Sequence, residues 1–361
     1  MLASIDARQP HNIRETAQIT NPLLQFFRIR ADGVGVGPPD SRAHENHQGA
    51  TRSVGQRSAL ADNPLGLDEL AIQVECDPNA LRRLLRALIG RGIFKRLRDG
   101  RYALTPLAQT LRWDAPGSMA ALASFIGSLQ DRENWSHCID AVRTGESVLP
   151  TLHGMDAFGW FTSEPELSEV FNKAMTNFSE FVVDAVTAAY DFCDYGTIVD
   201  IAGGYGRLLA GILAAAPAAK GVLFDLPGVV AGAEPLLRKH GVADRVRVAD
   251  GSFFESVPDG GDLYLLKNII HDWPDDGALQ ILNTVRAAAR DGATLVLVEC
   301  VIPPHDRDFV AKWTDLEMLV VNAGRECTAE EYRHLLQQSG FHLIRIIPTA
   351  SPFSIVKAKA A

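Results

Sequence analysis

A lysine, a histidine and three aspartates stand close together in residues 267–276, KNIIHDWPDD. A neutral histidine is suited to accept a proton near neutral pH, because its ordinary pKa is about 6.5. His271 could take the proton of a phenol, whose ordinary pKa is about 10, and general-base help of this kind typically accelerates a reaction by about 10² to 10⁴. Asp272 is its neighbour in the chain. The alternative is a histidine that only hydrogen-bonds a junction between two elements.

Two glutamates favour the chemical interpretation. Glu299 ends the apolar run VLVEC, and Glu326 lies in AGRECT, ahead of a predicted helix. A carboxylate beside an imidazole can fix its tautomer and stabilise its cation. Three ionisable groups at neighbouring positions of one edge argue for chemistry, although acids at strand ends are often solvated caps. The histidines and cysteines lack the spacing of metal sites, so we expect no metal.

A second group of residues surrounds the glycine-rich turn of VDIAGGYG. Gly203, Gly204 and Gly206 lie between an apolar run and a helical stretch, where glycines let the backbone approach a ligand. Asp225 ends the next apolar run, at the place where an acid binds ribose hydroxyls in nucleotide-binding sheets. A dinucleotide site is one interpretation, but position 209 is leucine and the spacing G-x-G-x-x-G is not met.

A third run ends near Ser252 and Phe253, which could contact an adenine ring. A simple turn with a core phenylalanine is an equal alternative.

The elements that must position these residues form an alternating series. Apolar runs at 197–202, 221–227, 245–250, 261–268 and 293–300 are separated by helical stretches. This alternation predicts an α/β fold with a doubly wound parallel sheet. Residues 341–349 and 353–360 are joined by a short turn and predict a C-terminal antiparallel hairpin. His271 and Glu299 then fall at the carboxyl edge of the sheet, where open sheets bind ligands.

The preceding part of the chain has a different pattern. Asp77-Pro78 predicts the start of a helix that runs through Leu88, and a hairpin follows around RDG at 98–100. Two helices followed by a hairpin predict a winged-helix unit, and helical periodicity continues from about 118 to 192, interrupted by a turn-rich stretch at 144–156.

Residues 28–58 contain no leucine and no aromatic residue, so we expect a loop or disorder there. Two explanations stay open, an inserted loop and an out-of-frame translation between two compensating shifts.

Composition bounds the class of protein. The chain has 361 residues, of which 47% are hydrophobic, which suits two domains with a substantial core. A net charge of −9 makes nucleic acid an unexpected partner. No apolar run approaches the roughly 20 residues of a membrane span, and no secretory signal is evident. The five cysteines show no paired spacing. We therefore expect a cytoplasmic protein with reduced thiols and no membrane contact.

The motifs VDIAGGYG, FDLP, YLLKNIIHDWPDD, LVECVIP and DLEMLVVNAGRECTAEEYRHLLQQSGF follow the winged-helix segment in this order. Together they resemble the class I S-adenosylmethionine-dependent O-methyltransferases, in the branch of plant caffeic-acid-type enzymes and bacterial enzymes that methylate natural products. The resemblance covers roughly residues 59–361.

The resemblance implies a Rossmann-like methyltransferase sheet preceded by a mainly helical winged-helix dimerisation domain. The implied boundaries are an irregular, partly disordered segment 1–58, a dimerisation domain 59–112, a helical linker with the acceptor pocket 113–192, and an S-adenosylmethionine-binding domain 193–361. It also implies a homodimer that transfers a methyl group to a hydroxyl of a small aromatic or polyketide-like acceptor.

The resemblance also assigns roles to single residues. His271 matches the catalytic base, with Asp272 beside it and Glu299 and Glu326 flanking it. The positions matching cofactor contacts are Met175, Ser179, Gly203, Gly204, Gly206, Asp225, Ser252, Phe253 and Lys267. The positions that line the acceptor pocket are Trp273, Met318 and Asn322.

Three positions depart from the family pattern: Ala202 replaces a usual glycine, Ser252 a common aspartate, and Cys327 a usual arginine. Two other functions stay open. One is a relative that binds the same cofactor without methylating, such as a hydroxylase or decarboxylase. The other is a winged-helix DNA-binding regulator, because residues 76–101 hold eight arginines and lysines against two aspartates.

Overall fold

The computed structural model describes residue 60, residues 63–115 and residues 118–361. They fall into two compact units, one that extends to Ser128 and one from Leu129 to Ala361. The predicted irregular segment 1–58, including the unusual tract 28–58, lies outside the described residues.

The first unit contains the predicted pair of helices and a hairpin. Helix α3 (Leu67–Gln73) is followed by α4 (Pro78–Gly90), which Asp77 caps by accepting a 2.8 Å hydrogen bond from the Ala80 amide. Strands β1 (Phe94–Arg96) and β2 (Tyr102–Leu104) pair antiparallel, as expected for a winged helix. Two helices close the unit, α5 (Pro106–Gln109) and α6 (Ala120–Ile126).

The second unit begins with helices. They are α7 (Leu129–Ser136), α8 (Cys138–Thr144), α9 (Leu149–His153), α10 (Ala157–Ser163) and the long α11 (Pro165–Ala189). The stretch at 144–156 was expected to be turn-rich, yet it contains α9. Gly145 and Gly154 end α8 and α9 in left-handed conformations, which explains why the glycines dominate the sequence signal there.

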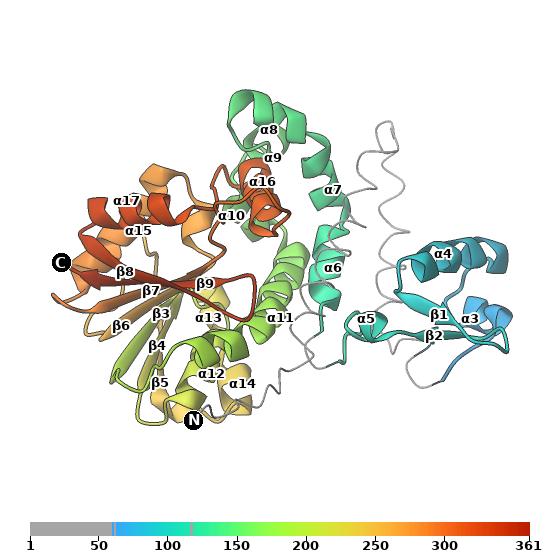
Figure 1. Cartoon of the computed structure of the whole chain (residues 1–361), viewed down its shortest axis with the longest axis horizontal. Helices are drawn as coiled ribbons and strands as arrows, with labels where there is room; N and C mark the ends of the chain where they lie inside the picture. Colours follow the sequence, from blue (N-terminus) through green and yellow to red (C-terminus); the bar gives the residue numbers. More distant parts are fainter. Residues whose placement is uncertain (1–59, 61–62, 116–117) are drawn as a thin grey trace, which may run out of the picture. The chain divides into compact units, whose positions relative to one another are not determined.

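A seven-stranded sheet forms the centre of this unit (Figure 1). Its order is β5-β4-β3-β6-β7-β9-β8, and the first five strands in that order are mutually parallel. The strands are β3 (Thr197–Ile201), β4 (Lys220–Asp225), β5 (Val246–Asp250), β6 (Leu263–Lys267), β7 (Thr294–Glu299), β8 (Phe341–Pro348) and β9 (Ser354–Ala360). All five apolar runs and the antiparallel hairpin are therefore where the sequence predicted them.

The strand order creates the ligand-binding edge. From β3 the chain proceeds outward to β4 and β5, and then returns to place β6 on the other side of β3. At this reversal the carboxyl ends of the neighbouring strands β3 and β6 lie side by side, which is the position where open α/β sheets bind ligands. The hairpin strand β9 pairs antiparallel with both β7 and β8, so it lies inside the sheet.

Helices cover both faces of the sheet (Figure 1). They are α12 (Arg207–Ala215), α13 (Pro227–Val230), α14 (Glu234–Lys239), α15 (Asp275–Ala288) and α17 (Ala329–Gln338), with short 3-10 turns η1 (Ala243–Arg245) and η2 (Ile270–Asp272). Helix α16 (Ala311–Val321) instead packs against α7, α8 and η2. Along β6, Leu263 and Leu265 join the core on the α12 side, whereas Tyr264 and Leu266 join the core on the α15 side. This alternation is the period of two of a strand buried on both faces.

Candidate active site

His271 lies in η2, directly beyond the carboxyl end of β6, and is only 7% exposed. Its Nδ1 lies 2.9 Å from Oε1 of Glu326 and 3.8 Å from Oε2 of Glu299. Its Nε2 lies 3.6 Å from Oδ1 of Asp272. The structure thus brings together the four residues expected to be catalytic, with two acids on one side of the imidazole and one on the other.

Each acid is held by further contacts. Glu299 Oε1 accepts hydrogen bonds of 3.1 Å from the amides of Ile269 and Ile270. Within the described residues, Oε2 of Glu299 and Oε2 of Glu326 are buried without a hydrogen-bond partner. A buried carboxylate without full compensation interacts strongly with a neighbouring cation, so the acids favour a positive charge on the ring.

The proton affinities follow from this arrangement. Burial lowers the pKa of His271, but the negative charges of Glu326, Glu299 and Asp272 outweigh burial and raise it to about 10. Burial raises the pKa of Glu299 to about 7 and that of Asp272 to about 6. The imidazole is therefore a strong base once it has lost its Nε2 proton.

A close backbone contact fixes η2. A Cβ on Gly324 would lie 2.0 Å from the carbonyl oxygen of His271 and 2.8 Å from the amide nitrogen of Trp273. Asn268 and Ala323 have φ values of 56° and 55°, so both segments are in left-handed conformations at this point. We did not predict this role of Gly324, because in the sequence it appears only as a glycine shortly before Glu326.

The glycine turn is tightly constrained. A Cβ on Gly203 would lie 2.5 Å from Oδ2 of Asp200, while Gly204 and Gly206 have φ values of +61° and +81°. The Gly204 amide donates a 2.8 Å hydrogen bond to Oδ2 of Asp225. Each of the three glycines is therefore required, two by backbone conformation and one by space. Ala202 also has a left-handed φ of 53°, which explains why glycine is usual at its position.

Three charged side chains lie at the strand ends around this turn. Asp225 ends β4, and burial raises its pKa. Burial lowers the pKa of Lys267 at the end of β6, while Glu299 and Asp200 oppose that effect. Asp200 is 2% exposed, its Oδ2 has no partner within the described residues, and burial raises its pKa to about 7. The sequence analysis missed Asp200, because an acid inside an apolar run is easily taken as a strand residue.

Aromatic rings cluster around Trp273, which follows His271 and Asp272 in the chain. The ring of Trp273 stacks on Phe158 with centroids 5.1 Å apart, and meets Phe253 and Phe254 edge to face at 6.0 and 4.7 Å. Ser252 Oγ accepts a 3.3 Å hydrogen bond from the Phe254 amide. Phe253 and Trp273, expected to contact cofactor and acceptor respectively, thus belong to one aromatic cluster.

The remaining predicted residues lie on two helices. Met318 lies on α16 and Asn322 directly follows it. Asn322 donates a 2.8 Å hydrogen bond to Oδ1 of Asp272, and its Nδ2 lies 3.8 Å from the Met318 sulfur. On α11, the Ser179 hydroxyl donates to the Met175 carbonyl at 2.8 Å. Met318 and Asn322 therefore adjoin the imidazole cluster, whereas Met175 and Ser179 make no hydrogen bond to the glycine turn within the described residues.

Cys327 is 4% exposed, and burial raises its pKa to about 12. Arg325 forms ion pairs with Asp275 and Glu331. The group that pairs with the carboxylate of Glu326 is therefore the imidazole of His271.

The ligand-type atoms of His271, Glu299 and Glu326 lie within 4.8 Å of one another, and the pairing of the imidazole with the two carboxylates accounts for this grouping. The Nδ1 of the imidazole is already satisfied by its hydrogen bond to Glu326.

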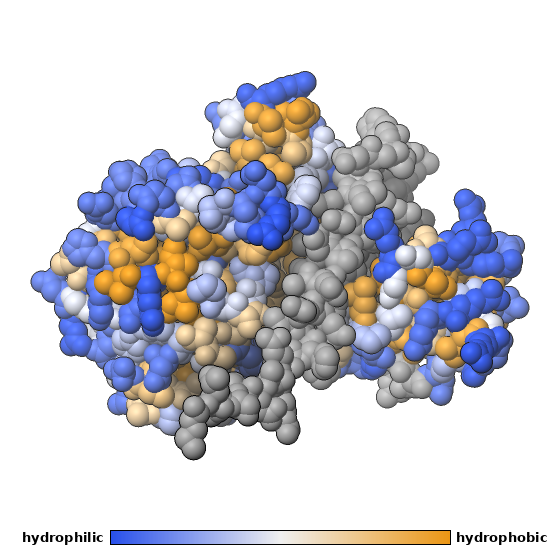
Figure 2. All heavy atoms as spheres, in the orientation of Figure 1, coloured by the Kyte–Doolittle hydropathy of each residue, from blue (hydrophilic) through white to orange (hydrophobic). Residues whose placement is uncertain are grey.

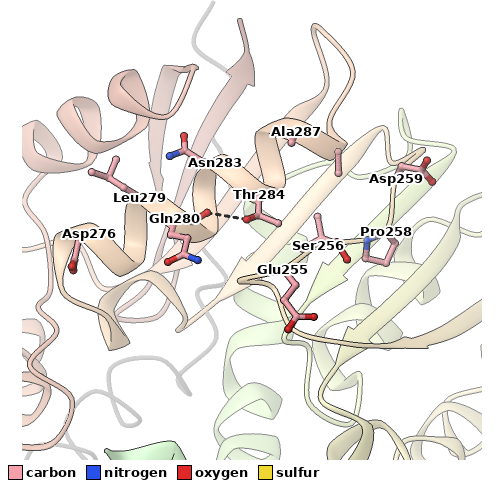
Figure 3. Close-up of a pocket in the computed structure, with 12 residues that line it drawn as sticks. Glu255, Ser256, Pro258, Asp259, Asp276, Leu279, Gln280, Asn283, Thr284 and Ala287 are labelled. Carbon is pink, nitrogen blue, oxygen red and sulfur yellow. Dashed lines mark hydrogen bonds between the residues drawn. The ribbon is translucent and has the colours of Figure 1, made fainter.

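A separate surface pocket lies between α15 and the segment 255–259 (Figure 3). Its lining includes Glu255, Asp259, Asp276 and Gln280, and none of the predicted site residues. Figure 3 shows Thr284 turned back to bond the Gln280 carbonyl.

Within the described residues, no helix combines the length and apolar character that a membrane crossing requires.

Comparison with known proteins identifies the class. The family described as O-methyltransferase domain matches residues 135–342, and the O-methyltransferase dimerisation domain matches residues 57–112. The chain is 39% identical over 306 residues to phenazine O-methyltransferase PhzM of Lysobacter antibioticus, covering 85% of this chain and 89% of that protein.

Solved structures agree. The crystal structure of LaPhzM has a TM-score of 0.80 at 37% identity, covering 89% of this chain and 98% of that chain. The O-methyltransferase NcsB1 from neocarzinostatin biosynthesis, in complex with S-adenosylmethionine and 2-hydroxy-5-methyl naphthoic acid, has a TM-score of 0.72 at 28% identity, covering 91% of this chain and 100% of that chain.

Proposed function

Because the chain belongs to the S-adenosylmethionine-dependent O-methyltransferase family, we propose that it methylates a hydroxyl of a small aromatic or polyketide-like acceptor with His271 as the base. The observation that carries the proposal is the 2.9 Å bond from His271 Nδ1 to Glu326, which leaves Nε2 as the nitrogen that can receive a proton. The phenazine and naphthoic acid in the names of the relatives support a polycyclic aromatic acceptor.

The glycine turn fits the family's cofactor. The space that a side chain at Gly203 would fill is bounded by Asp200, whose buried Oδ2 has no hydrogen-bond partner in the part of the chain that the structure describes. We propose that this oxygen accepts from the ammonium group of the cofactor's methionine part. Asp225 would bind the ribose, with one oxygen already oriented by the Gly204 amide. Ser252 and Phe253 would contact the adenine.

The chain's own residues would align the acceptor and remove one proton. When bound, S-adenosylmethionine supplies a methyl group activated by its sulfonium. His271 Nε2 would accept the hydroxyl proton, and Glu326 and Glu299 would stabilise the imidazolium that results. Trp273 would form a wall of the acceptor pocket, and Asp272, fixed by Asn322, would lie beside the reacting hydroxyl. Holding the reactants in a near-attack geometry contributes most of the acceleration.

The protonation state of His271 decides how the reaction begins. With a pKa raised to about 10 by its carboxylates, His271 is an imidazolium at neutral pH in the free protein. It must lose this proton before it can act as a base. A cation bound in the crevice lowers the pKa of His271 again, because like charges disfavour one another. The positive charge of the cofactor therefore favours the active form of the base.

The test is a transfer assay with radiolabelled S-adenosylmethionine and a panel of phenols, hydroxyphenazines, hydroxynaphthoates and polyketides. We expect label in at least one aromatic acceptor. His271→Ala should lower kcat by about 10² to 10⁴, with residual activity from alignment. Its cofactor affinity, measured by calorimetry, should stay within threefold of wild type. Wild-type rates in His271→Ala would remove the base assignment, and no transfer to any hydroxyl would remove the function.

We also propose that the chain is a homodimer built through residues 59–112 and the helices that follow. The match to the dimerisation domain supports this. Exposed apolar side chains on α7 and α8, which are Leu129, Ile139 and Val142, support it further. Figure 2 shows apolar surface at the end of the unit that carries α8. Light scattering after size exclusion should give twice the mass of the 39.2 kDa chain. A monomer at micromolar concentration would refute the proposal.

A further inference from the structure

Helix α16 contacts the imidazole cluster at both of its ends. Thr314 in its first turn donates through Oγ1 to Oε1 of Glu326 at 2.8 Å. Asn322, which follows the last turn, donates through Nδ2 to Oδ1 of Asp272 at 2.8 Å. One rigid element thus holds a carboxylate on the Nδ1 side of His271 and another on the Nε2 side.

Glu326 is held twice by consecutive residues of α16. Asp315 Oδ1 accepts a 3.0 Å hydrogen bond from the Glu326 amide, while Thr314 bonds the carboxylate. The Thr314 hydroxyl also lies 3.1 Å from the carbonyl of Ala311, the usual helical partner of a threonine. The contact with Glu326 is shorter and its acceptor is a carboxylate, so the Thr314 hydroxyl donates its hydrogen bond to Glu326.

Both donors to the Glu326 carboxylate share one oxygen. Oε1 accepts from Thr314 at 2.8 Å and from His271 Nδ1 at 2.9 Å, while Oε2 has no partner within the described residues. A second donor to the same oxygen stabilises part of its negative charge, so this oxygen attracts the imidazolium less strongly than it would without that donor. The strength of the bond to His271 therefore depends on Thr314.

We propose that Thr314 is a positioning residue that lowers the proton affinity of His271 by sharing Oε1 of Glu326 with it. The proposal rests on the proposed role of His271 as the base. Without the hydroxyl, the imidazolium alone compensates Oε1 and holds its proton more tightly. Fewer molecules then carry the neutral imidazole near neutral pH. Thr314 thereby acts on the reaction through Glu326, without contact to the reactants.

The other charges around His271 and Glu326 are the same in wild type and in a Thr314→Val variant. The titratable groups that act on His271 and Glu326 come from the ends of β6 and β7, from η2, from α16 and from α17 with its preceding segment. They are Asp272, Glu299, Cys300, Asp315 and Tyr332, and Lys267 and Cys327 act in turn on Glu299. Thr314→Val removes only a neutral hydroxyl and keeps the side-chain shape. A changed pKa of His271 in that variant therefore reports the lost hydrogen bond.

The experiment follows His271 directly by NMR titration of protein labelled with ¹⁵N-histidine, with the resonance assigned by its loss in His271→Gln. In Thr314→Val we expect the pKa of His271 to rise by about 0.5 to 1 unit, because this shift corresponds to the net free energy of one modest hydrogen bond. Thr314→Ser keeps the donor and should restore the wild-type pKa. Thr187→Val is the matched control, because the half-buried Thr187 on α11 bonds only helix carbonyls, at 2.9 Å to Val183.

Kinetics provide the second readout. Below the pKa, a rise of 0.5 to 1 unit leaves about 3 to 10 times less neutral base, so kcat should fall by that factor while the KM of the cofactor is unchanged. Identical titrations of His271 in wild type and Thr314→Val would overturn the proposal, as would failure of Thr314→Ser to restore the pKa. A raised pKa with an unmoved pH–rate profile would support the role of Thr314 and overturn His271 as the base.

Discussion

Replacing Gly324 by alanine should disable the imidazole cluster with little effect on the cofactor site. The new Cβ would lie 2.0 Å from the His271 carbonyl oxygen, where ordinary carbon–oxygen contacts are about 3.3 Å or longer. The two backbone segments must therefore separate by about 1.3 Å. The 2.9 Å bond from His271 to Glu326 cannot survive such a shift, because hydrogen bonds end near 3.5 Å.

A misplacement of about 1 Å costs on the order of 10² in rate, so we expect kcat of Gly324→Ala to fall about 100-fold in the transfer assay. Overpacking should cost about 1 to 3 kcal/mol, and each kcal/mol lowers the Tm by about 2 to 4 °C. Cofactor affinity by calorimetry should change less than threefold. The matched control is Gly90→Ala, since no atom lies within 4 Å of its added Cβ. A kcat within threefold of wild type in Gly324→Ala would refute the reasoning.

Four further outcomes are expected. The kcat/KM of the acceptor should rise with pH, because the pKa of His271 is raised to about 10 and only its neutral form accepts a proton. Glu326→Gln removes one of the charges that raise this pKa and should move the rising limb to lower pH; an unmoved limb would contradict the assignment. Ala202→Gly relieves a left-handed φ of 53° and should stabilise the fold by up to about 1 kcal/mol in urea denaturation; a free energy of unfolding below that of wild type would contradict this. Gly203→Ala places a Cβ 2.5 Å from Asp200 and should weaken cofactor binding at least about tenfold by calorimetry, whereas an unchanged Kd would disprove the close fit.

Much of the fold was predictable because a strand that is buried on both faces of the sheet appears in the sequence as a run of apolar residues. Four of the five parallel strands, such as Thr197–Ile201, are such runs, and their alternation with helices predicts the parallel sheet. The edge strand Val246–Asp250 is mostly exposed and carries a weaker apolar pattern. The position of β9 between β7 and β8 was not predictable, because a hairpin can add to a sheet by either strand. Local pattern fixes the two strands and leaves their order open.

The site was predictable only in part. His271 and Glu326 are 55 residues apart in the chain, so no local spacing rule joins them. The expectation came from placing them at one edge of the predicted sheet and from the resemblance to a family. Asp200 was missed because its carboxylate interrupts an apolar strand without changing the strand pattern. Gly324 and Thr314 were missed because their roles are contacts with distant segments. Such contacts depend on how η2, α16 and the segment before α17 pack, which residue types alone do not specify.

The interior place of Ser354–Ala360 has a consequence for how the enzyme matures. Strand β7, which ends in Glu299, has β6 on one side as soon as both are synthesised. Its other side stays unpaired until residues 354–360 leave the ribosome and insert. During translation the growing chain therefore exposes an open strand edge that ends at Glu299, an acid that is fully buried in the folded protein, and a chaperone would have most to protect at that stage.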